Sequence, residues 1–425
     1  MTEPQTLREL SCADDYDPNS MPVERARALI RQFLAPVTTV ERVHIRNALD
    51  RVLAEEIVSP FDVPGHDNSA MDGWAVRFAD LAANGETTLT TVGESFAGKP
   101  HGSAIGPGET VRIFTGGVMP AGADTVVMQE RAMAIDGGVR IGAGAVARAG
   151  TNRRFAGEDL KRGATVFRAG QPLHPAELGM LASLGIGEIG VYRKLRVAFF
   201  STGDELRSIG TPLAAGQIYD SNRYTLHGML TRLNCDVVDM GVVPDVPDAL
   251  ERAFATAAAT ADVVITSGGV SVGEADFVKQ LLDKLGEVLF WKIAMKPGRP
   301  LAYGKIGAAH FFGLPGNPVS VMVTFYEFVR DALLVLQGRA SVAPMPVFKA
   351  TLAAPIRKAP GRTEFQRGVL SLAAGGGWEV RTTGDQGSGI LSSMSQANCF
   401  IVLGTDTGNV AAGEPVDVQL LEGLI

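Results

Sequence analysis

Between residues 195 and 338, apolar and polar positions follow two alternating periods. Short apolar runs, LRVAFF, CDVVDMG, ADVVIT and HFFGL, are separated by the segments SNRYTLHGMLTRL, PDALERAFATAAATA and ADFVKQLLDKL, which have helical periodicity. Short buried strands that alternate with helices are typical of βαβ units, so this part is predicted to form a parallel sheet. The long apolar segment PVSVMVTFYEFVRDALLVLQG is predicted to close it as a helix.

The regions before residue 195 and after residue 338 have different patterns of apolar and polar residues. PVERARALIRQFL has apolar residues on one helical face, and VERVHIRNALDRVLAEEI and HPAELGMLASLGI are also predicted to be helices. Short β runs punctuated by glycine predict a small β domain before about Arg148, and the part after about Val342 predicts a β-barrel or sandwich without helices. We therefore divide the chain into a polar tail (1–20), two regions of helical or mixed character (21–60 and 149–190), a β-rich domain between them (61–148), an α/β domain (191–340) and a C-terminal β-barrel or sandwich (341–425).

Composition narrows the function classes. The chain has 425 residues, a net charge of −7 and no dense cluster of Lys and Arg, which argues against nucleic-acid binding. Its three cysteines form no CxxC pair, and the N-terminus has neither a basic nor an apolar leader. No window has 18 uninterrupted apolar residues. These features predict a cytoplasmic protein that does not enter a membrane.

Acidic side chains follow three of the predicted strands. Glu205 lies in STGDEL, Asp245 in VVPDVP and Asp276 in TSGGVSVGEAD. Ligands of open parallel sheets bind beyond the carboxyl ends of the strands, so these acids are candidates for one site. Any one of them alone is better explained by a structural role, such as a helix N-cap for Asp245 or a first-turn acid for Asp276. Three clustered carboxylates repel one another, however, and a hard cation such as Mg²⁺ would relieve that repulsion.

TSGGVSVGEAD has the glycines of a phosphate loop, Gly268 and Gly269, but acids where such a loop would have a lysine. Cations occur instead in WKIAMKPGRP, whose prolines stiffen the segment that contains Lys296 and Arg299. A single surface lysine would need no explanation, but the short KPGRP spacing directs two cations to one place. Acids for a metal and cations for an anion predict a phosphorylated substrate or an oxyanion.

Other motifs are weaker or missing. DNSAMDGWA is compatible with an Asx turn and RRFAGEDLKRG with surface ion pairs of little energetic value. HxH, HExxH and GxxxxGK[ST] patterns do not occur in the sequence.

Taken together, these segments resemble the molybdopterin molybdenumtransferase family, which includes MoeA and the gephyrin E-domain. The motifs are DNSAMDGWAVR, IFTGGVMPAGADTVVMQE, RRFAGEDL, STGDEL, IYDSNRYTL, TSGGVSVGEADFVK, KPGRPLAYG, FFGLPGNPVS, GRTEFQRG and GSGILSSMS, in that order from about Pro22 onward. The resemblance implies an α/β multidomain fold: a central parallel-sheet domain similar to the molybdopterin-adenylyltransferase fold, an inserted β domain, an elongated dimerisation region and a C-terminal β-barrel.

The resemblance also implies a reaction and its residues. Molybdate is inserted into adenylylated molybdopterin, AMP is released, and Mg²⁺ takes part in a homodimer whose inserted regions reach the partner's cleft. Further partners would be molybdopterin adenylyltransferase and molybdoenzymes or their chaperones. The implied residues are Asp276, Asp245, Glu205, Asp72, Thr115 and Asp159 for catalysis, the first three also for the metal; Ser271, Gly268, Gly269, Arg154, Lys292, Pro315, Asn317 and Pro318 for the substrate; and Lys296, Arg299, Ser320, Arg362 and Ser388 for molybdate.

Two alternatives stay open at this point. A non-catalytic scaffold or cofactor carrier is compatible with the E-domain resemblance, and an adenylyltransferase is compatible with the central domain. Trp74 stands where the family commonly has Tyr, and Arg299 stands where it commonly has Lys. Arginine keeps the positive charge, so anion binding is expected to survive.

Overall fold

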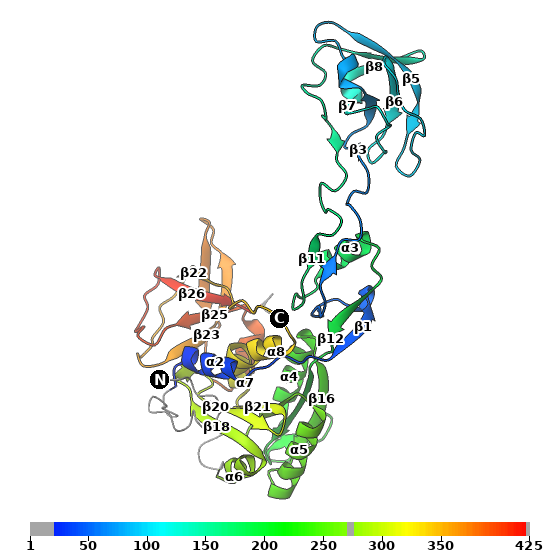
Figure 1. Ribbon diagram of the computed structural model, residues 1–425. Coiled ribbons are helices and arrows are strands. Elements are labelled where there is room, and N and C mark those ends of the chain that lie inside the picture. Colours follow the sequence, from blue (N-terminus) through cyan, green and yellow to red (C-terminus); the bar gives the residue numbers. More distant parts are fainter. Residues whose placement is uncertain (1–20, 270–275, 422–425) are drawn as a thin grey trace, which may run out of the picture. The chain divides into compact units, whose positions relative to one another are not determined.

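The computed structural model describes residues 21–269 and 276–421, with the backbone alone for residues 276–279 (Figure 1). Contacts divide the chain into two units. One comprises the described part of Met1–Ala54, Gly170–Pro175 and the described part of Glu188–Ile425, and the other comprises Glu55–Ala169 and Ala176–Gly187. The chain therefore leaves the first unit after Ala54 and returns to it at Gly170–Pro175 and again from Glu188.

A six-stranded sheet with the order β16-β13-β17-β21-β20-β18 forms the centre of the first unit. Its strands are β13 (Arg196–Thr202), β16 (Asp236–Val243), β17 (Val263–Ser267), β18 (Gly286–Lys292), β20 (Pro300–Ile306) and β21 (Ala309–Leu314). β16, β13, β17 and β21 are parallel, which confirms the predicted parallel sheet, and β20 and β18 continue it in antiparallel pairing. The sequence prediction did not include these last two strands.

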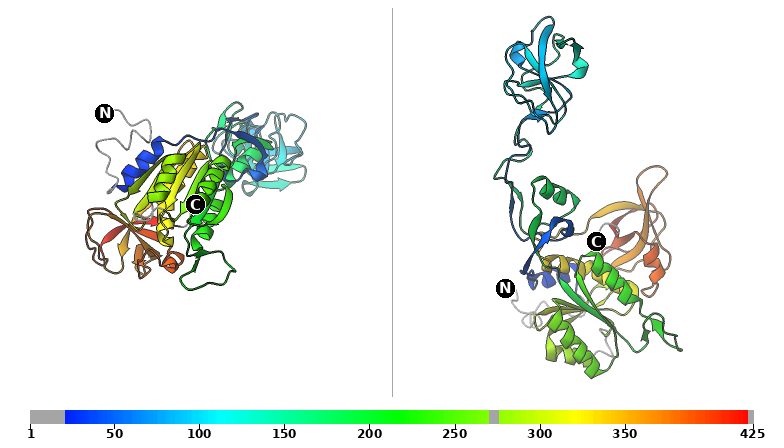
Figure 2. Two further views of the ribbon diagram at one scale, coloured as in Figure 1. Left: turned by 90° about the horizontal axis from the view of Figure 1, so that it is seen from below. Right: turned by 90° about the vertical axis from the view of Figure 1, so that its right-hand side faces the viewer.

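Helices cover both faces of this sheet, as Figures 1 and 2 show. Successive residues of a strand point to opposite faces. Phe199 accordingly packs in a core that includes residues of α2, α4 and the β21-linked helix, whereas Phe200 packs against α5 and α6. The helices are α2 (Val23–Gln32), α4 (Ser221–Arg232), α5 (Pro247–Thr260), α6 (Asp276–Leu285), α7 (Pro318–Thr324), η4 (Phe325–Val329) and α8 (Arg330–Leu336). Both faces are therefore apolar, which explains the near-continuous apolar runs of the parallel strands.

The long helix predicted after β21 is present, but it is not regular. α7 and α8 are joined by η4, a single π-helical turn, and the three segments run on without a break. Pro318 occupies the first turn of α7, where its missing N–H costs no hydrogen bond.

The C-terminal part is a closed five-stranded barrel, as predicted. Its strands are β22 (Val347–Leu352), β23 (Thr363–Leu372), β24 (Trp378–Thr382), β25 (Cys399–Leu403) and β26 (Pro415–Leu420). They follow the order β23-β24-β22-β26-β25, and the pairing of β23 with β25 closes the ring. The short helix α9 (Leu391–Gln396) lies between β24 and β25, so the expectation of a helix-free region was wrong.

The barrel is joined to the α/β domain by a strand pair and by shared core. β19 (Met295–Lys296) pairs in parallel with β23, and Phe365, Met394 and Phe400 belong to the same core cluster as the central sheet. The barrel and the sheet therefore share one continuous apolar interior.

The second unit contains the inserted β domain. Its sheet has the order β7-β4-β6-β5-β9-β8. The strands are β4 (Gly73–Val76), β5 (Thr87–Ser95), β6 (Glu109–Ile113), β7 (Thr125–Met128), β8 (Ala132–Ile135) and β9 (Gly138–Ile141), with short helices η2 (Phe78–Asp80) and η3 (Gln129–Arg131). Three further pieces of this unit are two strand pairs, β2 (Ile57–Val58) with β11 (Thr165–Phe167) and β3 (Asn68–Ser69) with β10 (Arg153–Arg154), and the helix α3 (Pro175–Ser183).

One predicted helix is a strand. Within VERVHIRNALDRVLAEEI, β1 (Val40–His44) pairs antiparallel with β12 (Glu188–Tyr192), and only the short turn η1 (Ile45–Asn47) is helical. Backbone hydrogen bonds to a segment far along the chain outweigh the local helical preference here. No helix in the described residues is long and apolar enough to cross a membrane.

The packing on the α5 side of the sheet gives the first prediction. Phe254 is buried, and its ring makes edge contacts with Phe200 and Phe311 at centroid distances of 5.2 and 5.6 Å. Phe254→Ala should lower the free energy of unfolding of the α/β domain by about 3–5 kcal/mol because it leaves a cavity. The exposed neighbour Arg252, replaced by Ala, should change it by less than about 0.5 kcal/mol.

Urea unfolding followed by Trp291 fluorescence measures both variants, in a background with Trp74 and Trp378 changed to Phe. Equal shifts in the two variants would contradict the packing described for α5.

Candidate functional site

A cavity of about 690 Å³ lies at the carboxyl edge of the parallel strands. The segments that follow β13, β16, β17 and β21 line it, together with α4 and part of the barrel. The lining residues are Thr202, Gly203, Asp204, Glu205, Leu206, Ile218, Tyr219, Asp220, Ser221, Asn222, Asp245, Ser267, Gly268, Gly269, Gly316, Asn317, Pro318, Gly389 and Leu391. The cavity is therefore where the topology of an open parallel sheet places a ligand.

Two acids predicted from the sequence meet at the ends of β13 and β16. The Thr202 hydroxyl donates to Asp245 Oδ1 at 3.3 Å, which ties the two strand ends together. Glu205 folds back over Gly203, because a Cβ at Gly203 would lie 2.7 Å from Glu205 Oε2. β14 (Leu206–Arg207) and β15 (Ile218–Tyr219) pair in parallel just beyond this point. Glu205 and Asp245 thus both face the cavity.

Gly268 allows the loop after β17 to approach β13 closely. Its φ is +94°, and a Cβ there would lie 2.5 Å from the carbonyl oxygen of Thr202. Its N–H donates to Leu314 O at 3.0 Å, so this N–H is already used inside the sheet. Gly268 contributes space and backbone conformation to the site rather than a free donor.

Helix α4 contributes two buried polar residues. Asp220 caps the helix by accepting from the Arg223 N–H, and Asn222 Nδ2 donates to Ser267 Oγ at 2.8 Å and to Gly316 O at 2.7 Å. Asp220 Oδ2 and Asn222 Oδ1 are buried without a hydrogen-bond partner. Buried oxygens without a partner are uncommon in proteins, and a water molecule or a bound group would satisfy these two.

The barrel supplies one wall of the cavity through residues 387–391. Ser388 accepts from Asn317 Nδ2 at 3.0 Å, and its carbonyl accepts from the Val319 N–H at 3.1 Å. Arg367 is 1% exposed and holds this wall from behind, donating to Gly387 O and to Ser393 Oγ. Burial lowers the pKa of the Arg367 guanidinium.

The cavity is strongly acidic. Asp204, Glu205, Asp220 and Asp245 line it, and its described lining contains no Lys, Arg or His. Among the described side chains no three His, Cys, Asp or Glu are gathered closely enough to hold a metal ion. The predicted third acid, Asp276, is the first residue of α6, but its side chain lies outside the described part, as do Ser271 and the loop around it.

The predicted cations lie at the same sheet edge but do not line the cavity. Lys292 ends β18, and the β18–β20 connection carries Lys296 and Arg299. Lys296 lies 3.7 Å from Glu364 of β23, and Arg362 directly precedes that strand. Lys296 thus lies beside Glu364, two residues after Arg362, and outside the lining of the acidic cavity.

The remaining predicted anion ligands connect the two groups. Ser320 is buried in α7, and its carbonyl oxygen lies 3.5 Å from the position of a Cβ on Gly298, within KPGRP. Ser388 belongs to the barrel wall already described. Asn317 and Pro318 line the acidic cavity, whereas Pro315 precedes its Gly316 without lining it.

In the second unit, two predicted residues form one cluster. Asp72 Oδ1 accepts from the N–H and the hydroxyl of Thr115, both at 2.8 Å. These bonds, the backbone one first, hold the pKa of the Asp72 carboxyl below its ordinary value, so Asp72 is ionised at neutral pH. Arg154 in β10 and Asp159 are exposed.

Comparison with known proteins identifies the family. The model of the MoeA N-terminal region (domain I and II) matches residues 21–185, that of a probable molybdopterin binding domain matches 198–335, and that of the MoeA C-terminal region (domain IV) matches 349–421. The chain belongs to the MoeA family. A molybdopterin molybdenumtransferase of Haemophilus influenzae is 46% identical over 403 residues, covering 95% of this chain and 99% of that protein.

More distant members agree. A molybdopterin molybdenumtransferase of Nostoc sp. is 37% identical over 90% of this chain and 88% of its own length. The crystal structure of the molybdopterin biosynthesis MoeA protein of Pyrococcus horikoshii is 30% identical, covers 95% of this chain and 100% of its own, and superposes with a TM-score of 0.81. The MoeA fold predicted from the sequence is thus confirmed along almost the whole chain.

Sequence reasoning did not single out three polar residues of this site. Asp220, Asn222 and Arg367 connect the strand ends, α4 and the barrel wall. Asp220 directly precedes the helical segment SNRYTLHGMLTRL, and an Asp at that position is a helix-start signal. No local signal indicates Arg367, because its partners come from another part of the barrel.

The close approach at Gly268 gives a prediction with an internal control. Gly268→Ala should lower the free energy of unfolding by about 1–3 kcal/mol, because it combines a positive φ with a clash on Thr202 O. Gly316→Ala should cost less than about 1 kcal/mol, since its Cβ would come only to 4.0 Å from Gly268 Cα. Chemical unfolding of the two variants measures the difference, and equal costs would contradict the close approach.

Proposed function

We propose that this MoeA-family protein is a Mg²⁺-dependent molybdopterin molybdenumtransferase, which inserts molybdate into adenylylated molybdopterin and releases AMP and molybdenum cofactor. Relatives that share most of the chain carry this name. The observation that carries the proposal is the acidic cavity at the carboxyl ends of the parallel strands, with Lys292, Lys296 and Arg299 at the same edge of the sheet.

The acidic cavity suits the diphosphate end of the substrate together with a cation. Four carboxylates and no basic side chain among its described lining residues would repel a phosphate unless a cation came with it. Hard oxygen donors, two of them buried without partners, fit Mg²⁺. We assign Glu205, Asp245 and Asp276 to hold it. When bound, Mg²⁺ supplies positive charge that stabilises the leaving AMP.

The protein's own residues position the bond to be cleaved. Thr202 orients Asp245 through its hydroxyl, and Gly268 leaves room for the diphosphate beside the strand ends. Asn317 and Ser388, which are hydrogen bonded to each other, close the opposite side and restrict access of water.

Molybdate is assigned to the cationic group. Molybdate is a tetrahedral dianion, and Lys296, Arg299 and Arg362 provide positive charge on adjoining segments, with Ser320 and Ser388 as hydroxyl donors. Lys292 and Arg154 are assigned to the pterin substrate. In this assignment the two substrates bind to groups of opposite charge. The acids bind the metal ion and the diphosphate, and the cations bind the oxyanion.

The second unit is assigned to a homodimeric site. Asp72 and Thr115 form a rigid, ionised cluster, and Arg154 and Asp159 are exposed nearby in the same unit. We propose that these residues complete the cleft of a partner subunit. A cytoplasmic location is proposed as well, since Cys235 and Cys399 are buried and unpaired.

The reaction itself provides the first functional test. Purified protein with adenylylated molybdopterin, Mg²⁺ and molybdate should release AMP, measured by chromatography. A parallel incubation with ATP and molybdopterin should consume no ATP, because the insertion step starts from the adenylylated form. Binding of the pterin without AMP release would contradict the proposed transferase and favour a carrier.

Asp245→Asn tests the metal assignment. The substitution should lower the rate of AMP release by about 100-fold or more, as the loss of one preorganised charge-stabilising group commonly does. The dependence on Mg²⁺ concentration should shift to higher values. Asp248→Asn, an exposed acid in the first turn of α5, is the matched control and should leave both unchanged.

A mixing experiment tests the homodimeric site. Asp72→Asn and Asp245→Asn homodimers should each be nearly inactive. Subunit exchange in an equal mixture should restore about a quarter of the wild-type rate, because half of the dimers are mixed and each of these has one intact site. If the subunits exchange but activity does not recover, Asp72 does not act in the partner's cleft. It would then act in the cleft of its own subunit or have no part in the reaction.

A further inference from the structure

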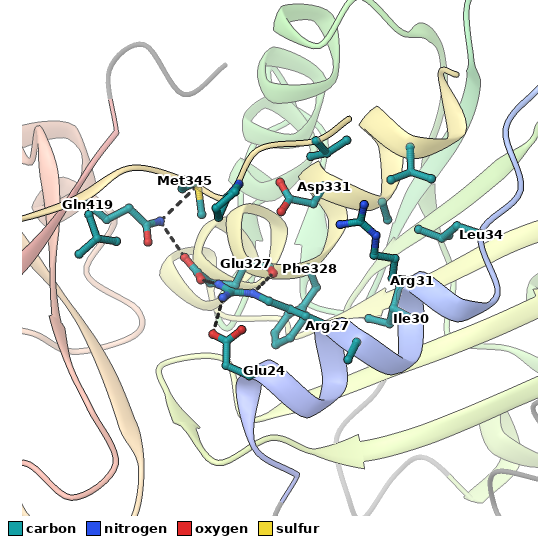
Figure 3. A pocket seen from close by; sticks show the side chains of 16 residues that line it. Glu24, Arg27, Ile30, Arg31, Leu34, Glu327, Phe328, Asp331, Met345 and Gln419 are labelled. Atoms are coloured by element: carbon teal, nitrogen blue, oxygen red, sulfur yellow. Dashed lines mark hydrogen bonds and ion pairs between the residues drawn. The ribbon is translucent and has the colours of Figure 1, made fainter. Parts of the chain in front are cut away.

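A second cavity, of about 500 Å³, lies in the first unit away from the strand ends (Figure 3). It is enclosed by α2, by η4 and α8, by the segment 342–347 and by β26. Most of its lining is apolar, but Glu327 lies at its base with Arg27 and Gln419 beside it. The segments around the cavity do not pack against one another across it. Glu327, Arg27 and Gln419 connect these segments instead.

Glu327 connects three distant segments of the chain. Its side chain is 0% exposed and forms an ion pair with Arg27 of α2. Gln419 Nε2, on β26 of the barrel, donates to Glu327 Oε1 at 2.9 Å, and Arg27 Nε donates to the Glu327 carbonyl at 2.9 Å. Figure 3 shows the three side chains converging from the N-terminal helix, the central helix and the barrel.

The position of Glu327 in the helix makes the backbone contact possible. It is the central residue of the π-helical turn Phe325–Val329. In such a turn the regular i→i−4 hydrogen bonds are interrupted, and π turns are frequent at functional positions. The irregular turn therefore supplies both a carboxylate and a carbonyl to the same guanidinium.

The same helix also contacts the acidic cavity. Its first turn holds the barrel loop through the Val319 N–H and Asn317, both bonded to Ser388. The barrel is thus attached to this helix by hydrogen bonds at two places: at Ser388 beside the acidic cavity, and at Glu327 further along. Loss of the second attachment would remove one of the contacts that fix the barrel on this helix, alongside the β19–β23 pairing and the shared core.

Stability does not explain this buried ion pair. Burial raises the pKa of Glu327 to about 7, although Arg27 and Gln419 lower it; the acids Asp331 and Glu24 raise it further. Of the other groups around the cavity, Arg31 is exposed on α2, Arg330 pairs with Asp331, and the segment 342–347 contributes only residues that do not titrate.

A raised carboxyl pKa means that the folded state binds the proton more tightly than the unfolded chain. Stability from this group is therefore greatest below pH 4.5, is lost as the pH rises towards 7, and stays low above it. Buried ion pairs are often less stabilising than neutral replacements, and some are retained because they specify one arrangement.

We propose that Glu327 is a positioning residue for the transferase reaction: through Arg27 and Gln419 it fixes the barrel on helix α7–η4–α8, and with it the wall 387–391 of the acidic cavity. This inference rests on the proposed function for its kinetic consequence, but its structural consequence is measurable separately.

Glu327→Gln tests the proposal. The near-isosteric amide fills the same space but removes the charge that faces Arg27. At pH 8, kcat/KM for AMP release should fall by about tenfold to 100-fold, because small misplacements remote from the chemistry have effects of this size. Hydrogen exchange of residues 387–391 should become faster, while Tm should be equal to or higher than that of the wild type.

Glu24→Gln is the matched control. Glu24 also pairs with Arg27, but its side chain is 81% exposed, so the change should alter kcat/KM by less than about twofold. The ratio of kcat/KM in Glu24→Gln to that in Glu327→Gln should rise as the pH increases from 6 to 8, because Glu327 loses its proton in that range. Gln419→Leu removes the bond from the barrel and should accelerate exchange of residues 387–391 as well.

A ratio that stays flat from pH 6 to 8, together with unchanged exchange of residues 387–391, would overturn the proposal. So would a loss of activity that merely follows a lower Tm. If the wild type itself releases no AMP, the proposed function fails, and the exchange measurement still decides whether Glu327 sets the position of the barrel wall.

Discussion

The structure of the first unit depends on the buried helix that begins at the end of β21. Its apolar residues, among them Val321, Phe325 and Leu333, belong to the same core cluster as the central sheet, α2 and the inner face of the barrel. Its first turn contacts the ligand cavity and its π-helical turn contacts both chain-terminal regions. Any movement of this helix therefore changes the core, the cavity wall and the position of the barrel together.

Acidic and basic side chains occupy different parts of the site, which the amino-acid composition does not show. The net charge of the chain is only −7, yet one cavity gathers four carboxylates and the β18–β20 connection with the start of β23 gathers the cations. Such a separation suits two substrates of different kind, a diphosphate that arrives with a metal ion and a free oxyanion. The buried oxygens of Asp220 and Asn222 add hydrogen-bond acceptors that have no partner in the protein.

Much of the α/β domain was predictable because its signals are local. The apolar runs of β13, β16, β17 and β21 and the periodicity of α4, α5 and α6 each lie within a short window. Predictions failed where partners are remote. β1 was expected to be helical because its residues favour a helix, but its pairing with β12 depends on a segment that returns much later in the chain. The short helix α9 and the antiparallel strands β18 and β20 have no strong period of their own.

The range of the interactions also decides which features of the site can be inferred from the sequence and which need the folded structure. The sequence by itself determined the alternation of parallel strands and helices in the α/β domain, the acids and cations near their ends and, through the order of its motifs, the family. Only the tertiary structure decided that Asp245 meets Thr202, that Gly268 must lie against β13, that Arg367 supports the cavity wall, and that Glu327 joins three segments. Periodicity and capping act over a few residues and are legible in the chain, whereas burial and hydrogen bonding between distant segments exist only after the chain has folded.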